Sequence, residues 1–214
     1  MIAIIDYGLG NLTSVLNAFE IMKIPAKITS DIDEIKNSEK IILPGVGSFG
    51  EGINNLRAMG LIEVLNDEIL VKKKPFLGIC LGMQLICKKS YENGEFTGLG
   101  WIDAEVVKFN FDNNDNTGNN NNEKLKVPHV GWNDVKCDLT SPIFKNDDEK
   151  KTQTFYFVHS YYVKPNNKEI VIGTCNYGFD FCAVLQKDNI FATQFHPEKS
   201  QHEGLNILRK FALI

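Results

Sequence analysis

Residues 75–86 read Pro-Phe-Leu-Gly-Ile-Cys-Leu-Gly-Met-Gln-Leu-Ile. The apolar run up to Ile79 is typical of a buried strand, and it leads directly into a second apolar run after Cys80. At the junction, Gly78-Ile79-Cys80-Leu81-Gly82 has the G-x-nucleophile-x-G pattern of a strand that turns sharply into a helix. The segment therefore predicts a buried strand that ends at a nucleophilic cysteine.

A turn of this kind would give Cys80 an unusual chemistry. The flanking glycines permit the strained backbone and keep bulk away from the sulfur atom. At the N-terminus of a helix, the dipole and free N–H groups favour thiolate over thiol, and the N–H of Leu81 would point at a developing oxyanion. The alternative is a small buried core cysteine, and the flanking glycines favour the nucleophile.

The residues before this segment alternate between strand and helix patterns. Asn11 is a good N-cap for the first helix, and Gly60 is a candidate break in the second. Alternation of this kind implies right-handed crossovers and a mainly parallel sheet with helices on both faces. The predicted elements are strands at residues 2–5, 26–29 and 40–43 and helices at residues 12–22 and 53–69.

The second half of the chain is richer in strands, which indicates antiparallel additions to the same sheet. A last amphipathic helix spans about residues 205–211. Between the halves, an Asn-rich tract at about residues 110–122 is too poor in apolar residues to offset its ordering entropy, so we interpret it as a solvated hairpin insertion. We expect an α/β fold with one domain over residues 1–214. The predicted strands cover residues 104–109, 132–135, 155–158, 170–175, 183–185 and 190–195.

The composition excludes several classes of function. The chain has 214 residues, 43% of them hydrophobic and 23% charged, with a net charge of −4, which is typical of a globular protein and offers no positive stripe for nucleic acid. No segment reaches the roughly 20 apolar residues of a membrane span, and no leader is visible after Met1. Five scattered cysteines form no disulfide framework and no zinc pattern. We therefore expect a cytoplasmic protein with no metal, no cofactor and no membrane or nucleic-acid partner.

A nucleophilic thiol needs a base to hold its proton, and the base needs a group that orients its ring. Phe195-His196-Pro197-Glu198 offers both, because residues two apart in an extended segment project to the same side. Alone, the tripeptide His196-Pro197-Glu198 is more typical of a capped turn. Its combination with the cysteine motif predicts a catalytic trio of Cys80, His196 and Glu198.

Three further features bear on the site. Pro44-Gly45-Val46-Gly47 follows the strand expected beside the cysteine strand, at the edge where parallel sheets bind ligands, so its glycines could aim a second N–H at the oxyanion. An ordinary strand-ending turn is the alternative. The glycine-rich residues 7–11 lack the dinucleotide fingerprint and are interpreted as a loop. His129, His159 and His202 could each be structural or surface histidines.

Together these motifs resemble the class I glutamine amidotransferases, and within that class the glutaminase subunits of imidazole glycerol phosphate synthases. The resemblance covers nearly the whole chain and implies a flavodoxin-like three-layer fold. The Asn-rich tract is not part of the family pattern. The resemblance rests on residues 78–84 and 195–200 and on Asp6-Tyr7-Gly8-Leu9-Gly10-Asn11, Leu43-Pro44-Gly45-Val46-Gly47, Gly98-Leu99-Gly100-Trp101, Pro128-His129-Val130-Gly131-Trp132-Asn133 and Tyr156-Phe157-Val158-His159-Ser160-Tyr161.

The resemblance implies a reaction and a partner. Cys80 would attack the side-chain amide of glutamine, His196 would protonate the departing ammonia, and a (β/α)8-barrel cyclase would receive that ammonia. By the same matching, residues at the glutamine and oxyanion site would be Gly45, Val46, Gly47, Leu81, Gln84, Ser160 and Tyr161. Residues at the partner interface would be Asn11, Trp132, Tyr156 and Lys199.

Two other interpretations remain open on sequence alone. A paralogous glutaminase that feeds ammonia to a different synthase, such as one that amidates a surface sugar, would carry the same motifs. A non-catalytic binding module could keep the fold, although it would have no need of nucleophile, base and orienting carboxylate together.

Overall fold

The computed structural model describes residues 1–111, 125–145 and 150–214. Within them, thirteen strands form one mixed sheet that is covered by helices. The helices are α1 (Leu12–Ile21), α2 (Ile32–Asn37), α3 (Phe49–Ala58), α4 (Leu61–Asn66), α5 (Leu81–Leu85) and α6 (Gln201–Leu213). Shorter helical turns are a π-helix at Asp67–Val71 and 3-10 turns at Lys168–Ile170 and Pro197–Lys199.

Five strands form the parallel core of the sheet, in the order β2-β1-β3-β4-β13. The core strands are β1 (Ile2–Ile5), β2 (Ala26–Thr29), β3 (Lys40–Gly45), β4 (Phe76–Cys80) and β13 (Ile190–Thr193). This is the flavodoxin-like strand order, in which ligands bind outside the carboxyl ends of the strands. The prediction of an α/β fold with a parallel core is confirmed.

The remaining strands extend the sheet beyond β13, mostly by antiparallel pairing, as predicted for the second half. One branch runs from β12 through β10, β7 and β5 to β6, with β5 and β7 parallel, and another runs from β12 through β11 and β8 to β9. These strands are β5 (Cys87–Ser90), β6 (Phe96–Thr97), β7 (Ile102–Lys108), β8 (His129–Cys137), β9 (Thr152–His159), β10 (Tyr161–Pro165), β11 (Val171–Asn176) and β12 (Asp180–Lys187).

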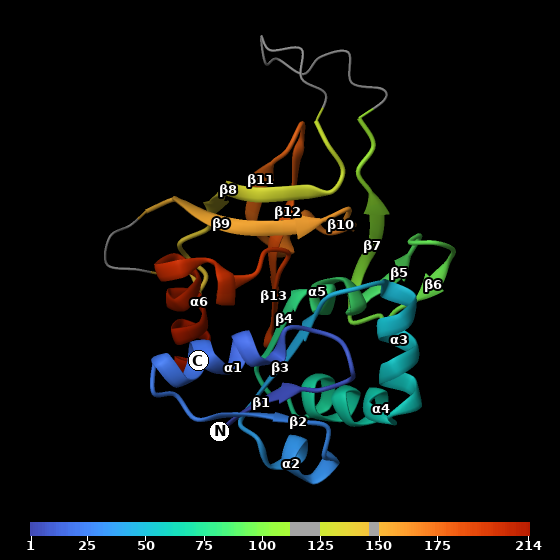
Figure 1. Cartoon of the computed structure of the whole chain (residues 1–214), viewed down its shortest axis with the longest axis vertical. Coiled ribbons are helices and arrows are strands. Elements are labelled where there is room, and N and C mark those ends of the chain that lie inside the picture. The colour runs from blue at the N-terminus through green and yellow to red at the C-terminus, as the bar shows by residue number, and fades with distance from the viewer. Residues whose placement is uncertain (112–124, 146–149) are drawn as a thin grey trace.

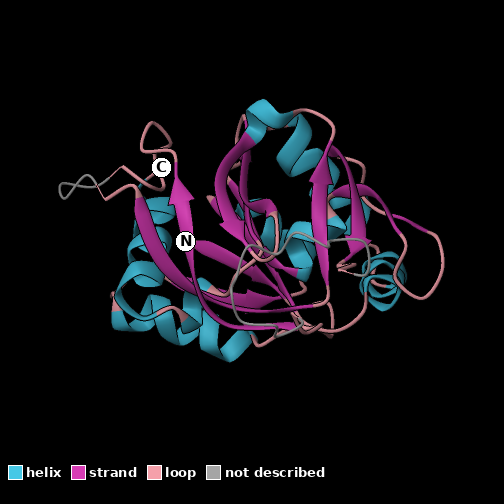
Figure 2. Ribbon diagram, turned by 90° about the horizontal axis from the view of Figure 1, so that it is seen from above, coloured by secondary structure: helices cyan, strands magenta, loops and turns pink. Residues whose placement is uncertain are grey.

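The two faces of the parallel core bury two separate hydrophobic clusters. In β1, Ala3 and Ile5 join one cluster while Ile2 and Ile4 join the other, because successive side chains of a strand point to opposite faces. Helices α2, α3, α4 and α5 supply the first cluster, and α1 and α6 supply the second. Figures 1 and 2 show the resulting three layers, with helices on both sides of the strands.

The structure differs from the sequence prediction mainly in short elements. Helix α2 and strands β5, β6 and β10 were not predicted, since two to six residues show too little periodicity to stand out. The strand predicted at residues 190–195 ends at Thr193. The break at Gly60 is confirmed: this residue has a φ of 66° and separates α3 from α4.

Apart from Asn110 and Phe111, the predicted Asn-rich insertion lies outside the described residues. Phe111 lies at its near end, with its ring stacked on Phe109 at 5.7 Å between centroids. No helix in the described part of the chain is long and apolar enough to cross a membrane.

Candidate active site

Cys80 lies at the junction of β4 and α5 with a φ of 53° and a ψ of −105°, a conformation that side-chain-bearing residues rarely adopt. Such strain persists only where the surroundings fix it, and it is concentrated at functional sites. The side chain is 7% exposed and lies at the carboxyl end of the parallel core. The predicted sharp strand-to-helix turn at Cys80 is confirmed.

The flanking glycines are required by close packing of backbone on backbone. A Cβ atom on Gly82 would overlap the carbonyl oxygen of Leu43, and one on Gly78 would lie 2.9 Å from the carbonyl group of Gly82. Strand β3 therefore presses directly against the start of α5, which holds Cys80 in its strained position.

The loop after β3 lies beside the nucleophile, as predicted. In the parallel ladder of β3 and β4, Gly45 is the register partner of Cys80. Gly47 has a φ of 105°, in the region that favours glycine. Gly45 itself packs beneath the loop, between the side chains of Tyr7 and Leu81. The buried hydroxyl of Tyr7 has no hydrogen-bond partner among the described residues, and burial raises the pKa of Tyr7 well above its ordinary value.

His196 and Glu198 form a buried pair. Nδ1 of His196 lies 2.8 Å from Oε1 of Glu198, and the two side chains are 2% and 1% exposed. The extended conformation predicted for this segment is wrong beyond His196, because Pro197–Lys199 forms a 3-10 turn. The proline at the start of the turn favours this conformation, and the turn itself brings the carboxylate back to the ring.

The backbone of His196 is fixed by strand β9. Its N–H donates to the carbonyl of Tyr156 at 3.0 Å, and the hydroxyl of Ser200 donates to its carbonyl at 2.6 Å. The same hydroxyl accepts the N–H of Tyr156 at 3.0 Å. Ser200 therefore links the backbone of His196 to β9, a contact that the sequence alone did not reveal.

Three influences set the protonation of His196. Burial lowers the pKa of His196, but the interactions with Cys80 and Glu198 outweigh burial and raise the pKa to about 10. Nδ1 is taken by Glu198, while the buried Nε2 has no well-formed hydrogen bond among the described residues. An imidazolium with a free N–H next to the sulfur of Cys80 is suited to donating a proton to a leaving group.

These groups open into one cavity of about 490 Å³. It contains Cys80 and His196 together with every residue predicted for the glutamine and oxyanion site except Gly45. Lys199, predicted for the partner interface, also lines it. The lining residues are Val46, Gly47, Cys80, Leu81, Gln84, Glu92, Pro128, Val158, His159, Ser160, Tyr161, His196 and Lys199.

A hydrogen-bonded row of amides supports the wall of the cavity. Nε2 of Gln84 donates to the carbonyl of Tyr161 and to Oε1 of Gln194, both at 3.1 Å. Nε2 of the fully buried Gln194 then lies 3.7 Å from the sulfur of Cys80. Gln194 was missed by sequence reasoning, although its place two residues before His196 puts it on the same strand end.

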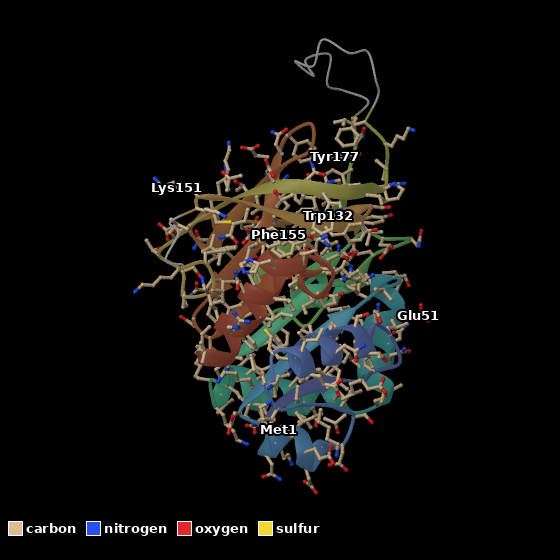
Figure 3. All side chains as sticks on the ribbon, turned by 60° about the vertical axis from the view of Figure 1, so that its left-hand side comes forward. Met1, Glu51, Trp132, Lys151, Phe155 and Tyr177 are labelled. Carbon is tan, nitrogen blue, oxygen red and sulfur yellow. The ribbon has the colours of Figure 1, made fainter. Side chains whose placement is uncertain are left out.

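The residues predicted for the partner interface lie on separate elements, and of the four only Lys199 lines the cavity. Asn11 caps α1, accepting the N–H of Ser14 at 3.4 Å. Trp132 on β8 and Tyr156 on β9 are register partners whose rings lie 5.9 Å apart. Trp132 is 47% exposed and lies in the half of the molecule away from Met1 (Figure 3).

Cys80, His196 and the carboxylate of Glu198 are buried at the carboxyl end of a flavodoxin-like sheet, an arrangement suited to a cysteine-dependent hydrolase. The family model "Glutamine amidotransferase class-I" matches residues 3–214, and the chain is therefore a class I glutamine amidotransferase. Subunit HisH 1 of imidazole glycerol phosphate synthase from Campylobacter jejuni is 49% identical over 212 residues, covering 99% of both chains. The chain belongs, within its class, to these HisH glutaminase subunits.

Other relatives agree with this assignment. Subunit HisH 2 from Pseudomonas aeruginosa is 42% identical over 211 residues, covering 99% of this chain and 98% of that one. Among solved structures, PurLQS from Thermotoga maritima superposes with a TM-score of 0.71 at 17% identity, covering 98% of this chain and 96% of that one. That likeness supports the fold alone.

Proposed function

We propose that the chain is the cytoplasmic glutaminase subunit of an imidazole glycerol phosphate synthase, with Cys80 as nucleophile, His196 as acid and base, and Glu198 as the group that orients His196. The observation that carries the proposal is the convergence of a strained Cys80 and a Glu198-paired His196 on one cavity. A binding module would have no use for this combination.

In the first half of the reaction, the sulfur of Cys80 attacks the side-chain amide carbon of glutamine. The carbonyl oxygen becomes an oxyanion, which the N–H of Leu81 and an N–H of the Val46–Gly47 loop stabilise. His196 gives its proton to the amide nitrogen, the C–N bond breaks, and ammonia leaves. The product on the enzyme is a glutamyl thioester at Cys80.

In the second half, His196 takes a proton from a water molecule, and the resulting hydroxide attacks the thioester carbon. The C–S bond breaks, glutamate leaves, and the sulfur and imidazole return to their starting states. Glu198 keeps the ring in one orientation throughout, because its contact with Nδ1 leaves Nε2 for the reacting atoms.

Glutamine binds, in this proposal, along the wall formed by Gln84, Ser160 and Tyr161. Gln84 is 5% exposed and already hydrogen-bonded to the wall, so it shapes the pocket rather than reaching freely into it. Domain organisation follows the same proposal: one glutamine amidotransferase domain over residues 1–214, interrupted by the Asn-rich insertion.

The partner is a (β/α)8-barrel cyclase that consumes the ammonia in histidine biosynthesis. Direct transfer matters because ammonia released into neutral water is protonated and stops being a nucleophile. The exposed side chains of Val130 and Trp132, on the strand next to the cavity wall, support docking of the barrel on this side. Asn11, Tyr156 and Lys199 complete the proposed interface.

A second candidate keeps the glutaminase chemistry and changes the acceptor. Relatives are numbered HisH 1 and HisH 2, and Methanococcus maripaludis has both. Copies in one genome can serve different synthases, for example one that amidates a surface sugar. Rescue of a histidine auxotroph that lacks its own glutaminase subunit, grown without ammonia supplementation, supports the histidine pathway; a failure to rescue alongside active glutaminase supports the second candidate.

The test of the chemistry uses Cys80→Ala. This variant should fold and bind the partner but form no glutamate from glutamine, and glutamate formation at the wild-type rate would contradict the proposal. A pull-down from the native lysate, with mass spectrometry of the copurifying synthase, identifies the acceptor. We expect the isolated chain to hydrolyse glutamine slowly until that synthase is added.

A further inference from the structure

Two histidines outside the proposed trio face each other in the interior. His129 on β8 and His159 on β9 are register partners, and Nδ1 of His129 lies 3.0 Å from Nε2 of His159. Nε2 of His129 lies 2.8 Å from the side-chain amide of Asn133, and Nδ1 of His159 lies 2.8 Å from the carbonyl oxygen of Tyr161. All four ring nitrogens are thus engaged in one row of hydrogen bonds.

The chemistry of the last acceptor fixes where every proton lies. A carbonyl oxygen only accepts, so Nδ1 of His159 carries a proton that is donated to Tyr161. In a neutral His159, Nε2 is then an acceptor, and Nδ1 of His129 must donate to it. In a neutral His129, Nε2 is in turn an acceptor, which requires the N–H of the Asn133 amide. A half-turn of that amide places Nδ2 where Oδ1 lies without moving any other atom.

The surroundings of the pair favour neutral rings. His129 is fully buried between the rings of Tyr177 and Phe157, at centroid distances of 4.0 and 4.8 Å. Burial lowers the pKa of His129, and burial together with the neighbouring His129 and His196 lowers the pKa of His159 to about 3. Tyr177 lies in the same part of the molecule as Trp132 (Figure 3).

The row of hydrogen bonds ends at the carbonyl oxygen of Tyr161, a residue that lines the cavity. The carbonyl of Tyr161 accepts the N–H of His159 and the N–H of Gln84, so both of its lone pairs are occupied. Tyr161 and its neighbour Ser160 line the cavity, and Gln84 continues the row through Gln194 to the sulfur of Cys80. Whatever holds this carbonyl therefore sets one wall of the pocket.

We propose that His129 and His159 are positioning residues: they form a one-way hydrogen-bonded chain, with all three donors directed from Asn133 toward the Tyr161 carbonyl, that holds the Ser160–Tyr161 wall in its glutamine-binding position. Aligned donors polarise one another, so the row is stiffer than three independent hydrogen bonds. The effect on glutamine rests on the proposed function, whereas the proton arrangement does not.

The proton arrangement is tested in the unmodified protein by nitrogen-15 NMR of labelled histidine, since the chain has only four histidines to assign. We expect both His129 and His159 as neutral Nδ1–H tautomers, unchanged between roughly pH 6 and 8. This is a distinctive signature, because a free neutral histidine prefers the Nε2–H form. A His129 that carries its proton on Nε2, or on both nitrogens, overturns the proposal.

Asn133→Asp tests the direction of the chain. A carboxylate cannot donate, so His129 must then hold protons on both nitrogens to keep its contact with His159, and the NMR signals should change to those of an imidazolium. If the amide oxygen of Asn133 already accepted from Nε2–H, the substitution would leave the tautomer of His129 unchanged, and the proposal would be wrong.

The positioning role is tested by covalent labelling of Cys80. With 6-diazo-5-oxonorleucine, an electrophilic glutamine analogue, His159→Leu should raise the concentration for half-maximal labelling by roughly tenfold, the equivalent of one lost hydrogen bond. Labelling by iodoacetamide, which needs no glutamine pocket, should stay within about twofold. His159→Asn should recover part of the loss, because its amide nitrogen can reach the Tyr161 carbonyl.

His202→Gln, on the exposed side of α6, is the matched control. It should leave the labelling of Cys80 by both reagents unchanged. Equal losses with both reagents indicate general damage to the fold and contradict a positioning role, as does unchanged labelling in His159→Leu. If the glutamine analogue fails to label Cys80 in the wild-type chain, the proposed function is wrong. The NMR result still decides the proton arrangement.

Discussion

Nδ1 of His196 lies 2.8 Å from Oε1 of Glu198, and both side chains are almost completely buried. A buried imidazole would ordinarily become neutral, yet Cys80 and Glu198 together keep the pKa of His196 at about 10. The pair therefore keeps an acid at neutral pH in a place where burial alone would remove it.

Replacing Glu198 by Gln should make the enzyme a poor proton donor. The pKa of His196 falls because one of the two groups that raise it loses its charge, so the loss of activity on the alkaline side moves to lower pH. Glutaminase kcat/KM at neutral pH should fall roughly a hundredfold to ten-thousandfold. Rates measured across pH with the partner synthase present check this, with the exposed Glu63→Gln as control; an unchanged profile would contradict the role of Glu198.

The strain at Cys80 predicts an inverted order of stability between two inactive variants. Glycine adopts a φ of 53° without strain, whereas alanine is strained there as cysteine is. The free energy of unfolding, measured in urea, should therefore be about 1 kcal/mol higher for Cys80→Gly than for Cys80→Ala after the entropy cost of glycine. At Glu63, an ordinary helical position, the order should be reversed, with Glu63→Ala more stable than Glu63→Gly by a similar amount. Finding alanine more stable at both positions would show that Cys80 is not strained.

Gly82→Ala should disrupt the cysteine turn by steric overlap with the Leu43 carbonyl. We expect a destabilisation of about 3 kcal/mol or more, with loss of glutaminase activity in whatever folds. Gly100→Ala isolates the conformational cost, since Gly100 has a φ of 73° but open space around its Cα, and it should lose only about 1 kcal/mol. Thermal unfolding of both variants measures the difference. A small loss of stability in both would mean that β3 moves to accommodate the added methyl group at little cost.

An ion cluster around Glu68, in the π-helix Asp67–Val71, gives a pH-dependent prediction. The carboxylate of Glu68 is 1% exposed and lies 2.6 Å from both Lys72 and Lys74. Burial raises the pKa of Glu68, but the two lysines outweigh it and hold the pKa below its ordinary value of 4.5. A depressed folded-state pKa stabilises the protein above about pH 4.5 and ceases to do so as the pH falls through the folded value.

Glu68→Gln should therefore cost about 3 kcal/mol at neutral pH, because the largely buried Lys74 loses its counterion, whereas the half-exposed Lys72 keeps Asp67 at 2.9 Å. The difference from wild type should shrink on acidification below about pH 4.5. Urea unfolding at neutral and acidic pH measures both values, and Glu63→Gln on α4 again serves as the control. A difference that persists at acidic pH would indicate lost packing instead of lost charge.

The sequence predicted the parts of this molecule whose causes are local. The glycines around Cys80, the apolar runs of β1, β3 and β4 and the break at Gly60 each follow from backbone sterics or periodicity over a few residues. Short elements such as α2 and β10 escaped because their burial depends on neighbours distant in the chain. Residues 197–199 were predicted as extended, although proline at the first position is equally suited to a helical turn.

The same division holds for the site. Cys80, His196 and Glu198 are predicted from the sequence because their residue types and motifs are typical of nucleophile, base and orienting carboxylate. Gln194, Ser200 and the pair of His129 and His159 are ordinary polar residues until the fold brings β8, β9 and the segment after β13 together. Their roles depend on hydrogen bonds across more than thirty residues of chain or between adjacent strands, and no local pattern encodes such contacts.

The cavity has a floor and a roof of separate origin. Cys80, Leu81, Val46 and His196 form the floor, at or just beyond the ends of the parallel strands. Pro128, which precedes β8, and residues 158–161, at the end of β9 and the start of β10, form the roof. The outer surface of the roof can therefore diverge, or be redesigned to receive another synthase, while the bond-breaking atoms below keep their places. Changes to the outer surface alone could in this way let the same glutaminase site supply ammonia to different synthases.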